Sequence, residues 1–255
     1  MSNKLFKDHF SEDAQSYAGA RLTYPPEIFA WLAEIAPHQR VAWDCGTGNG
    51  QAAIGLANHF ERVLATDASA SQIAHAYPHT KIEYSVARES QSSLADGAAA
   101  LVTAFSAVHW FNQKAFFAEA QRVLGRKGVC AIWCSSLPQV TPHIDAILDD
   151  FHHDTLAPWW PPERAQVDAR YQPIKFPFVE LDSPGFSFEK HWTLDRFAKL
   201  LRSWSGVRRY QAALGHDPID PLIKQMQHLW GSDIRRVTWH LYGRIGRVEK
   251  PYNVK

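Results

Sequence analysis

Asp44 and the glycines that follow it are the residues of this sequence whose types and spacing best suit ligand chemistry. The acid lies in an apolar, β-prone run, residues 41–45, and Gly46, Gly48 and Gly50 follow at alternate positions. Residues 51–57 then have the composition of a helix. Glycine lacks Cβ and adopts positive φ, so such a turn lets a ligand approach the backbone closely. A strand, a glycine turn and a helix together predict a nucleotide-type site at the carboxyl end of a parallel strand.

The spacing of these residues indicates which nucleotide would bind. The dinucleotide fingerprint G-x-G-x-x-G requires glycine at position 51, where this chain has Gln51. The pattern present is D-x-G-x-G-x-G, which resembles motif I of the class I S-adenosylmethionine-dependent methyltransferases. A second β-prone run, residues 62–67, ends at Asp67, where an acid would hold both ribose hydroxyls. A glycine turn alone is also typical of a tight structural turn, but the turn together with both acids predicts a bound adenosyl cofactor.

Further segments are similar to the small-molecule methyltransferases that include trans-aconitate methyltransferase. They are Val108-His109-Trp110-Phe111, residues 119–129, Phe176-Pro177-Phe178, Ser203-Trp204-Ser205 and Trp230-Gly231. Residues 17–25 are similar to the pattern Y-x3-R-P-x-Y-P of that family, with Leu22 where proline is usual. The resemblance spans nearly the whole chain, and it is specific for fold and cofactor but only weakly specific for substrate. It implies S-adenosylmethionine as cofactor, S-adenosylhomocysteine as product, and a small organic acceptor methylated on a carboxylate or hydroxyl oxygen.

The resemblance also implies the residues of the cofactor site. They are Tyr17, Arg21, Asp44, Gly46, Thr47, Gly48, Gly50, Asp67, Ala68, Ala87, Arg88, Glu89, Phe105 and Ser106. In this interpretation the glycines line the methionine half, Asp44 orients its ammonium group or a bridging water, and Asp67 binds the ribose. Arg21 and Tyr17 would hold the cofactor carboxylate, because guanidinium pairs with carboxylate through two hydrogen bonds. An arginine in a terminal segment is otherwise usually solvated. The adenine amino group would be bound by the backbone after the third strand or by Glu89.

Catalysis by such a site needs few side chains, because holding the acceptor in line with an activated methyl group and excluding water supply much of the rate. His109 is the candidate catalytic residue, since histidine suits proton transfer at neutral pH. Alternatively its ring packs the loop and bonds to the backbone, and a carboxylate acceptor would need no base. Candidates for lining the substrate pocket are Trp110, Trp159, Trp160 and Trp204, although aromatic residues also form cores. No metal site is predicted.

Repeated strand–helix units are predicted to position these residues. Strands are expected at residues 41–45, 63–66, 81–86, 98–105, 129–134, 186–192 and 237–245, the last of them antiparallel at or near the sheet edge. Helices are expected at residues 26–35, 51–60, 69–76, about 116–124 with a closing turn at 125–128, and 141–155, 194–204, 206–214 and 218–230. The fold class is therefore α/β, a doubly wound, mostly parallel, Rossmann-like sheet of seven strands with a helical, tryptophan-rich cap inserted toward the C-terminus.

Three regions of the chain are expected to differ in role. Residues 1–36 would form N-terminal lid helices, residues 37–137 the cofactor-binding Rossmann-like core, and residues 138–255 the cap or substrate region with the final strands. After Ser135 prolines break the chain into short pieces, and six of the ten tryptophans lie in this part. Its helices are expected to cover the carboxyl ends of the strands and to enclose a small substrate.

Composition argues against several other classes of protein. Twenty-seven basic and 26 acidic residues leave a net charge of +1 with no cationic block, so nucleic acid is not an expected partner. No apolar run is long enough for a membrane span or a signal peptide, and three cysteines are too few for a disulfide framework. We therefore expect a cytoplasmic protein, monomeric or homodimeric.

Two other functions remain open at this level. A methyltransferase that acts on RNA or protein is one, although this chain lacks a basic stripe and has Thr-Ala-Phe-Ser at residues 103–106 instead of an Asn/Asp-Pro-Pro-aromatic segment. A non-catalytic protein that binds an adenosyl cofactor, or a dinucleotide oxidoreductase, is the other.

Overall fold

A computed structural model of the chain describes residues 24–249, and the predicted cofactor ligands Tyr17 and Arg21 lie outside these residues. The chain divides into two compact units. Of the described residues, the first contains 24–134, Ala169–Phe186 and 241–249. The second contains Ser135–Asp168 and Ser187–His240. Both units are thus built from separate stretches of sequence.

The sheet has a doubly wound order that reverses beside its first strand. The parallel strands are β1 (Val41–Cys45), β2 (Arg62–Asp67), β3 (Ile82–Val86), β4 (Ala99–Phe105) and β5 (Leu124–Ser135). Seven strands follow one another in the order β3-β2-β1-β4-β5-β8-β6, and an eighth, β7 (Phe186–Trp192), pairs with β8. The chain runs outward from β1 to β3 and then returns to the other side of β1 as β4. A reversal of this kind opens a crevice at the carboxyl ends of β1 and β4, where α/β proteins bind ligands.

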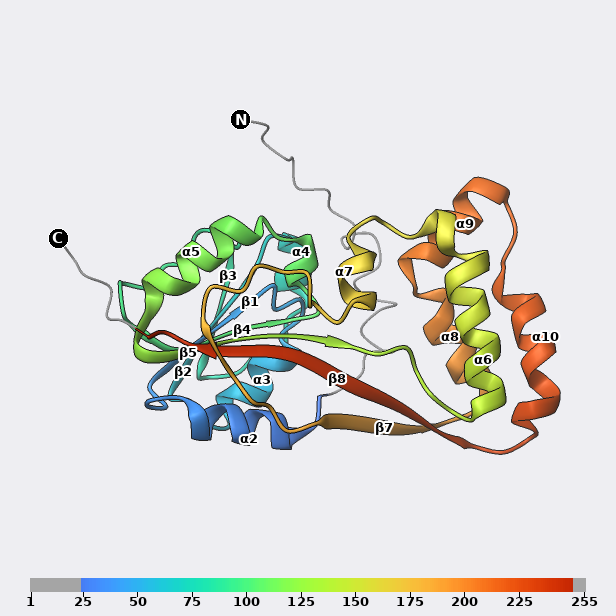
Figure 1. Cartoon of the computed structure of the whole chain (residues 1–255), viewed down its shortest axis with the longest axis horizontal. Coiled ribbons are helices and arrows are strands. Elements are labelled where there is room, and N and C mark those ends of the chain that lie inside the picture. Colours follow the sequence, from blue (N-terminus) through green and yellow to red (C-terminus); the bar gives the residue numbers. More distant parts are fainter. Residues whose placement is uncertain (1–23, 250–255) are drawn as a thin grey trace. The chain divides into compact units, whose positions relative to one another are not determined.

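Helices cover both faces of the first unit's sheet. Figure 1 shows α2 (Pro26–Ile35) and α3 (Gln51–Ala57) on one side and α5 (Gln113–Val123) on the other. Every residue of β4 is buried as a result, as its continuous apolar sequence predicts. The helices α2 and α3 approach closely at Gly55, where a Cβ would lie 2.1 Å from the ring of Phe29. The short α4 (Ala70–Ala74) begins after Ser69, whose hydroxyl accepts a hydrogen bond from the Gln72 amide.

The predicted α/β fold is confirmed, and the differences are shifted element ends and one additional strand, which makes the sheet eight-stranded where seven strands were expected. The helix expected at 51–60 ends at Ala57. The turn expected at 125–128 lies inside β5, because Leu124 already pairs with Ala99 while Val129 pairs with Leu101, so the residues between them bulge from the ladder. Lys127 adopts φ +61° in this bulge. The strand β6 (Val179–Leu181), antiparallel to β8 (Arg235–Arg247), was not expected, and β8 therefore lies next to the edge strand.

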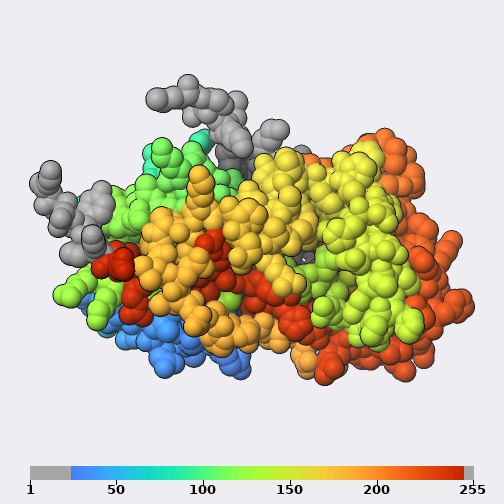
Figure 2. Space-filling view, viewed as in Figure 1, coloured from blue at the N-terminus to red at the C-terminus, as the bar shows by residue number. Residues whose placement is uncertain are grey.

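The second unit is mainly helical and rich in tryptophan, as the sequence predicts. Its helices are α6 (Pro142–Asp150), α7 (Arg164–Asp168), α8 (Leu194–Arg202), α9 (Ser205–Leu214) and α10 (Ile219–Trp230). The helix expected at 141–155 changes at Phe151 into a π-helical turn, Phe151–Thr155, and a short 3-10 turn, Ala157–Trp159, follows. Trp230 is fully buried against Phe197, and Trp239 stacks on Phe188. The segment after α6, coloured yellow, is visible at the surface of this unit in Figure 2.

No helix among residues 24–249 is long and apolar enough to cross a membrane. The three cysteines, Cys45, Cys130 and Cys134, are buried thiols and form no disulfide.

Candidate functional site

The glycine turn after β1 has the backbone conformation that its sequence predicts. Gly46, Gly48 and Gly50 have φ values of +70°, +57° and +91°. A Cβ on Gly46 would lie 2.5 Å from Cβ of Ala107, and one on Gly50 would lie 2.1 Å from the hydroxyl of Tyr84. The protein itself therefore occupies the space beside the outer two glycines. Gly48 lies between them and is partly exposed, with its amide donating to Oδ2 of Asp67 at 2.8 Å.

Asp44 joins the turn to the neighbouring strand. Its side chain is buried, with Oδ2 accepting a hydrogen bond from Thr47 Oγ1 at 2.6 Å and Oδ1 accepting one from Thr103 Oγ1 in β4 at 2.8 Å. Burial raises the pKa of Asp44 to about 6, and the two hydroxyls oppose that rise by stabilising the carboxylate. The charge of Asp67 adds to the rise. Asp44 thus holds β1, the turn and β4 together at the point where the strand order reverses.

Asp67 ends β2 and fixes the turn from the other side. Oδ2 accepts the Gly48 amide, and Oδ1 accepts the Ser69 amide at 2.8 Å. Ala68 lies between these residues and is partly exposed. The Asp67 carbonyl also accepts the amide of Ala87, the first residue after β3, at 3.0 Å. The carboxyl ends of β2 and β3 are therefore held beside the glycine turn, as the predicted site requires.

Two further loops meet this edge of the sheet. Oε1 of Glu89 accepts the amide of Asn112 at 3.0 Å, which links the loop after β3 to the start of α5. Arg88 lies in that loop and is exposed. Phe105, the last residue of β4, stacks on Trp133, and the next residue, Ser106, adopts φ +52° with its amide donating to the Trp133 carbonyl at 2.7 Å. A positive φ in a residue other than glycine is a form of backbone strain that clusters at functional sites.

His109 lies beyond β4 in the short 3-10 turn Val108–Trp110, and its ring contacts that of Trp110. Nδ1 of His109 lies 2.8 Å from the hydroxyl of Tyr171, so this ring nitrogen has a side-chain partner. Tyr171 is fully buried, and both it and Arg170 adopt positive φ, +61° and +53°. Sequence reasoning did not single out Tyr171, because it is distant in the chain and belongs to no motif.

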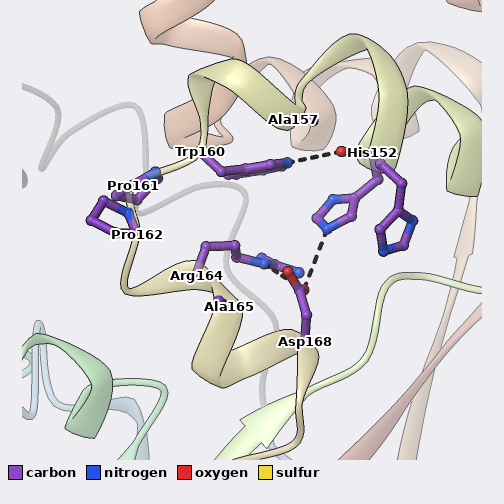
Figure 3. Close-up of a pocket in the computed structure, with 9 residues that line it drawn as sticks. His152, Ala157, Trp160, Pro161, Pro162, Arg164, Ala165 and Asp168 are labelled. Atoms are coloured by element: carbon purple, nitrogen blue, oxygen red, sulfur yellow. Dashed lines mark hydrogen bonds and ion pairs between the residues drawn. The ribbon is translucent and has the colours of Figure 1, made fainter.

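The remaining predicted substrate residues, Trp159, Trp160 and Trp204, lie in the second unit. Trp159 packs against Tyr210, and Trp160 packs against Trp204 at a centroid distance of 5.8 Å. All three are partly exposed, whereas Trp230 and Trp239 are core residues. Only Trp160 lines the pocket that Figure 3 shows in this unit. Within the described part of the chain, no group of three or more His, Cys, Asp or Glu side chains is arranged to hold a metal ion.

Comparisons with known proteins agree with this geometry. A family model described as a methyltransferase domain matches residues 43–132. A protein of Dictyostelium discoideum, provisionally named a methyltransferase, is 30% identical over 224 residues, which cover 86% of this chain and 85% of that protein. A solved structure from Anaeromyxobacter dehalogenans, provisionally named a type II methyltransferase, is 38% identical with a TM-score of 0.84 and covers 89% of this chain and 97% of its own. The YcgJ protein of Bacillus subtilis shares the fold at 15% identity, with a TM-score of 0.52 and coverage of 87% and 99%.

Proposed function

Because this chain belongs to the class I S-adenosylmethionine-dependent methyltransferases, we propose that it methylates a small organic molecule on oxygen. The observation that carries the proposal is the glycine turn at the reversal of strand order, held between Asp44 and Asp67. The resemblance of the sequence to the trans-aconitate methyltransferase-like enzymes supports a small acceptor. So does the balance of 27 basic and 26 acidic residues, which offers no cationic stripe to a polyanion.

The residues at the turn fit an adenosyl cofactor. Gly46 and Gly48 are partly exposed and the three glycines of the turn have positive φ, so we assign the backbone of this turn to the approach of the ligand. We assign Asp67 and Ala68 to the ribose, the turn with Asp44 and Thr47 to the methionine half, and the loop from Ala87 to Glu89 to the adenine. Phe105 and Ser106 would complete the site at the end of β4. When bound, the cofactor supplies a methyl group already activated by its sulfonium.

The protein's own contribution to the reaction is placement and, for some acceptors, a base. An acceptor carboxylate is ionised at neutral pH and needs no proton removed, whereas a hydroxyl does. We assign proton transfer to His109, which follows β4 in the chain and whose Nδ1 lies 2.8 Å from the hydroxyl of Tyr171. Tyr171 would orient the imidazole, because a hydrogen bond to one ring nitrogen sets which nitrogen carries the proton. Trp110 would line the acceptor side of the same loop.

We assign residues 138–255 to the substrate side of the enzyme, with Trp159, Trp160 and Trp204 as candidate contacts. An enclosed pocket of aromatic and apolar residues with a few polar groups is the usual composition of a small-molecule site. The chain would then act on metabolites rather than on RNA or protein.

The proposal is tested by incubating the full-length protein with a metabolite extract and S-adenosylmethionine that carries an isotopically labelled methyl group. We expect mass spectrometry to show a labelled small molecule together with S-adenosylhomocysteine. A matched incubation with an RNA and protein extract should give no labelled polymer. A protein that binds S-adenosylhomocysteine in calorimetry but labels neither extract would be a non-catalytic cofactor-binding protein, and micromolar affinity for NAD without S-adenosylhomocysteine binding would contradict the cofactor assignment itself.

A further inference from the structure

A pocket of about 270 Å³ lies entirely within the second unit (Figure 3). Its walls come from the π-helical turn Phe151–Thr155, from the segment that follows it, and from α7. The lining residues are His152, His153, Ala157, Trp160, Pro161, Pro162, Arg164, Ala165 and Asp168. Single π-helical turns are rare and are frequent at functional sites, so this departure from the α-helix at His152 is notable.

His152 has a polar atom that the described residues leave unsatisfied. The side chain is 1% exposed, its Nε2 lies 3.3 Å from Oδ1 of Asp168, and its Nδ1 is buried without a hydrogen-bond partner. Burial lowers the pKa of His152, with Arg164 and His153 adding to the decrease and Asp168 opposing it. Burial therefore favours the neutral ring, which has one N–H and one acceptor nitrogen. With the N–H assigned to Nε2 facing the carboxylate, Nδ1 is an acceptor that lacks a donor. Buried polar atoms rarely lack a hydrogen-bond partner.

Arg164, Asp168 and Trp160 complete a rigid set of side chains around the ring. Nε of Arg164 donates to Oδ1 of Asp168 at 2.8 Å, and the guanidinium lies 4.9 Å from the centroid of the Trp160 ring. The indole Nε1 of Trp160 in turn donates to the carbonyl of His152 at 3.0 Å, and the two rings are 4.8 Å apart. Figure 3 shows the imidazole between the indole and the carboxylate. The flat wall and the polar groups are thus held before any ligand arrives.

The charges in the pocket select the chemistry of its ligand. Arg164 and Asp168 already pair with each other, and burial disfavours the charged form of His152, so these three side chains offer a charged ligand no unpaired partner of opposite sign. A hydroxyl carries no charge and can both donate and accept. It can donate to Oδ2 of Asp168, which accepts no hydrogen bond from the described residues, and it reaches the unsatisfied nitrogen of His152 when the closely packed rings of His152 and Trp160 move apart.

We propose that this pocket binds a small neutral ring compound with a hydroxyl group, its ring against Trp160 and its hydroxyl donated to the His152–Asp168 pair. The inference goes beyond the proposed function, since it names a ligand of the second unit and does not depend on which compound is methylated. Binding itself does not require methyl transfer, and the two can therefore be tested separately.

The experiment compares three ring compounds that differ in charge, phenol, benzoate and benzylamine, as ligands of the full-length protein at pH 7.5 by ligand-observed NMR. We expect phenol to bind at least about tenfold more tightly than the two ions, the factor that one hydrogen bond contributes. His152→Phe removes the acceptor nitrogen, and Ala165→Phe fills the pocket from an exposed position on α7 while leaving the His152–Asp168 pair intact. Both variants should lose phenol binding. The exposed His143 on α6 provides the control, because His143→Gln should bind phenol as the wild type does.

S-adenosylhomocysteine binding, measured on the same samples, separates the possible failures. If S-adenosylhomocysteine binds but phenol does not, or phenol binds no better than the ions, the pocket proposal is wrong and the proposed function stands. Phenol binding that survives Ala165→Phe also overturns the pocket proposal, and this result can be read even if His152→Phe fails to fold. An ordered water alone would then satisfy Nδ1 of His152. Loss of S-adenosylhomocysteine binding in the wild type would instead contradict the proposed function.

Discussion

At the scale of single residues, the glycines of the turn after β1 have two different roles. Gly46 and Gly50 are required by the protein's own packing, since a side chain on either would overlap Ala107 or Tyr84. Gly48 has the same left-handed backbone, and its amide donates to Asp67. Substitutions at these positions should therefore separate stability from cofactor binding.

We predict that Gly48→Val abolishes S-adenosylhomocysteine binding, because it places a branched side chain where the backbone meets the ligand and forces φ +57° on a β-branched residue. Isothermal calorimetry measures the loss. Gly215→Val is the matched control, because Gly215 also has a positive φ, +75°, at the end of α9 and has no atom within 4 Å of an added Cβ. It should cost stability on the order of 1–3 kcal/mol from strain and leave cofactor affinity unchanged. If both variants bind S-adenosylhomocysteine with equal affinity, Gly48 is not part of the cofactor site.

The raised pKa of Asp44 predicts a pH dependence of stability. The folded protein holds the Asp44 proton to about pH 6 while the unfolded chain releases it near 3.8, so between these values the native state binds more protons. The contribution of Asp44 to the free energy of unfolding is therefore full below pH 3.8 and is lost as pH rises through 6. Asp44→Asn should abolish this slope, since an amide can donate to one threonine hydroxyl and accept from the other. Urea unfolding between pH 4 and 7 tests it, and parallel curves for wild type and variant would contradict it.

At the scale of elements, the short turn Val108–Trp110 and the segment containing Tyr171 are joined by the hydrogen bond and ring contact between His109 and Tyr171. Two consecutive residues with positive φ, Arg170 and Tyr171, bring the tyrosine into the core beside His109. Backbone strain of this kind persists only where the surrounding structure fixes it. The structure around Arg170 and Tyr171 therefore fixes the tyrosine beside His109.

For a hydroxyl acceptor we predict that His109→Gln lowers kcat by at least about a hundredfold, the usual contribution of a general base, without changing cofactor affinity. Tyr171→Phe keeps the ring but removes the orienting hydroxyl, and it should lower kcat less and shift the pH profile of the rate. Steady-state kinetics from pH 5 to 9 measure both effects. If a carboxylate proves to be the acceptor, full activity of His109→Gln is the expected result, and the histidine would then have only a packing role.

The elements that sequence reasoning predicted correctly are those with a strong local pattern. Strand β4 is an unbroken apolar run, and α2 begins at Pro26 and ends before Pro37, so their bounds were predictable. The bulge at 125–128 was not predictable, because glycine and lysine are typical of a turn as well as of a bulge when the pairing strand is unknown. Strand β6 has three residues and exists through its pairing with β8, which no local pattern reveals. Asp44 and Asp67 lie in a local sequence pattern, so their places at the ends of β1 and β2 were predictable. The contacts of His109 with Tyr171 and of His152 with Asp168 join residues that no local pattern relates, so they were not.

At the scale of the whole molecule, the formal charges of 27 basic and 26 acidic residues almost cancel, and this predicts how activity depends on salt. A polyanionic substrate held by several lysines and arginines loses affinity steeply as salt rises, because bound counterions are released. A small neutral acceptor has no such dependence. We expect kcat/KM to change by less than about threefold between 50 and 300 mM potassium chloride, against losses of about 10³ or more for a typical polyanion complex. A steep decrease would favour RNA as the substrate.

The place of β8 in the sheet has a consequence for how the protein is made. This strand comes last among the described elements, yet it lies between β5 and β6. On the ribosome, β5 and β6 emerge well before their shared neighbour, and each then presents an unpaired row of backbone N–H and C=O groups to other nascent chains. Completion of the sheet must wait for Arg235–Arg247, so the protein is most prone to aggregate late in its synthesis. A prematurely terminated chain that stops before this strand would keep the edges of β5 and β6 unpaired. Chaperones and proteases would then bind or degrade it.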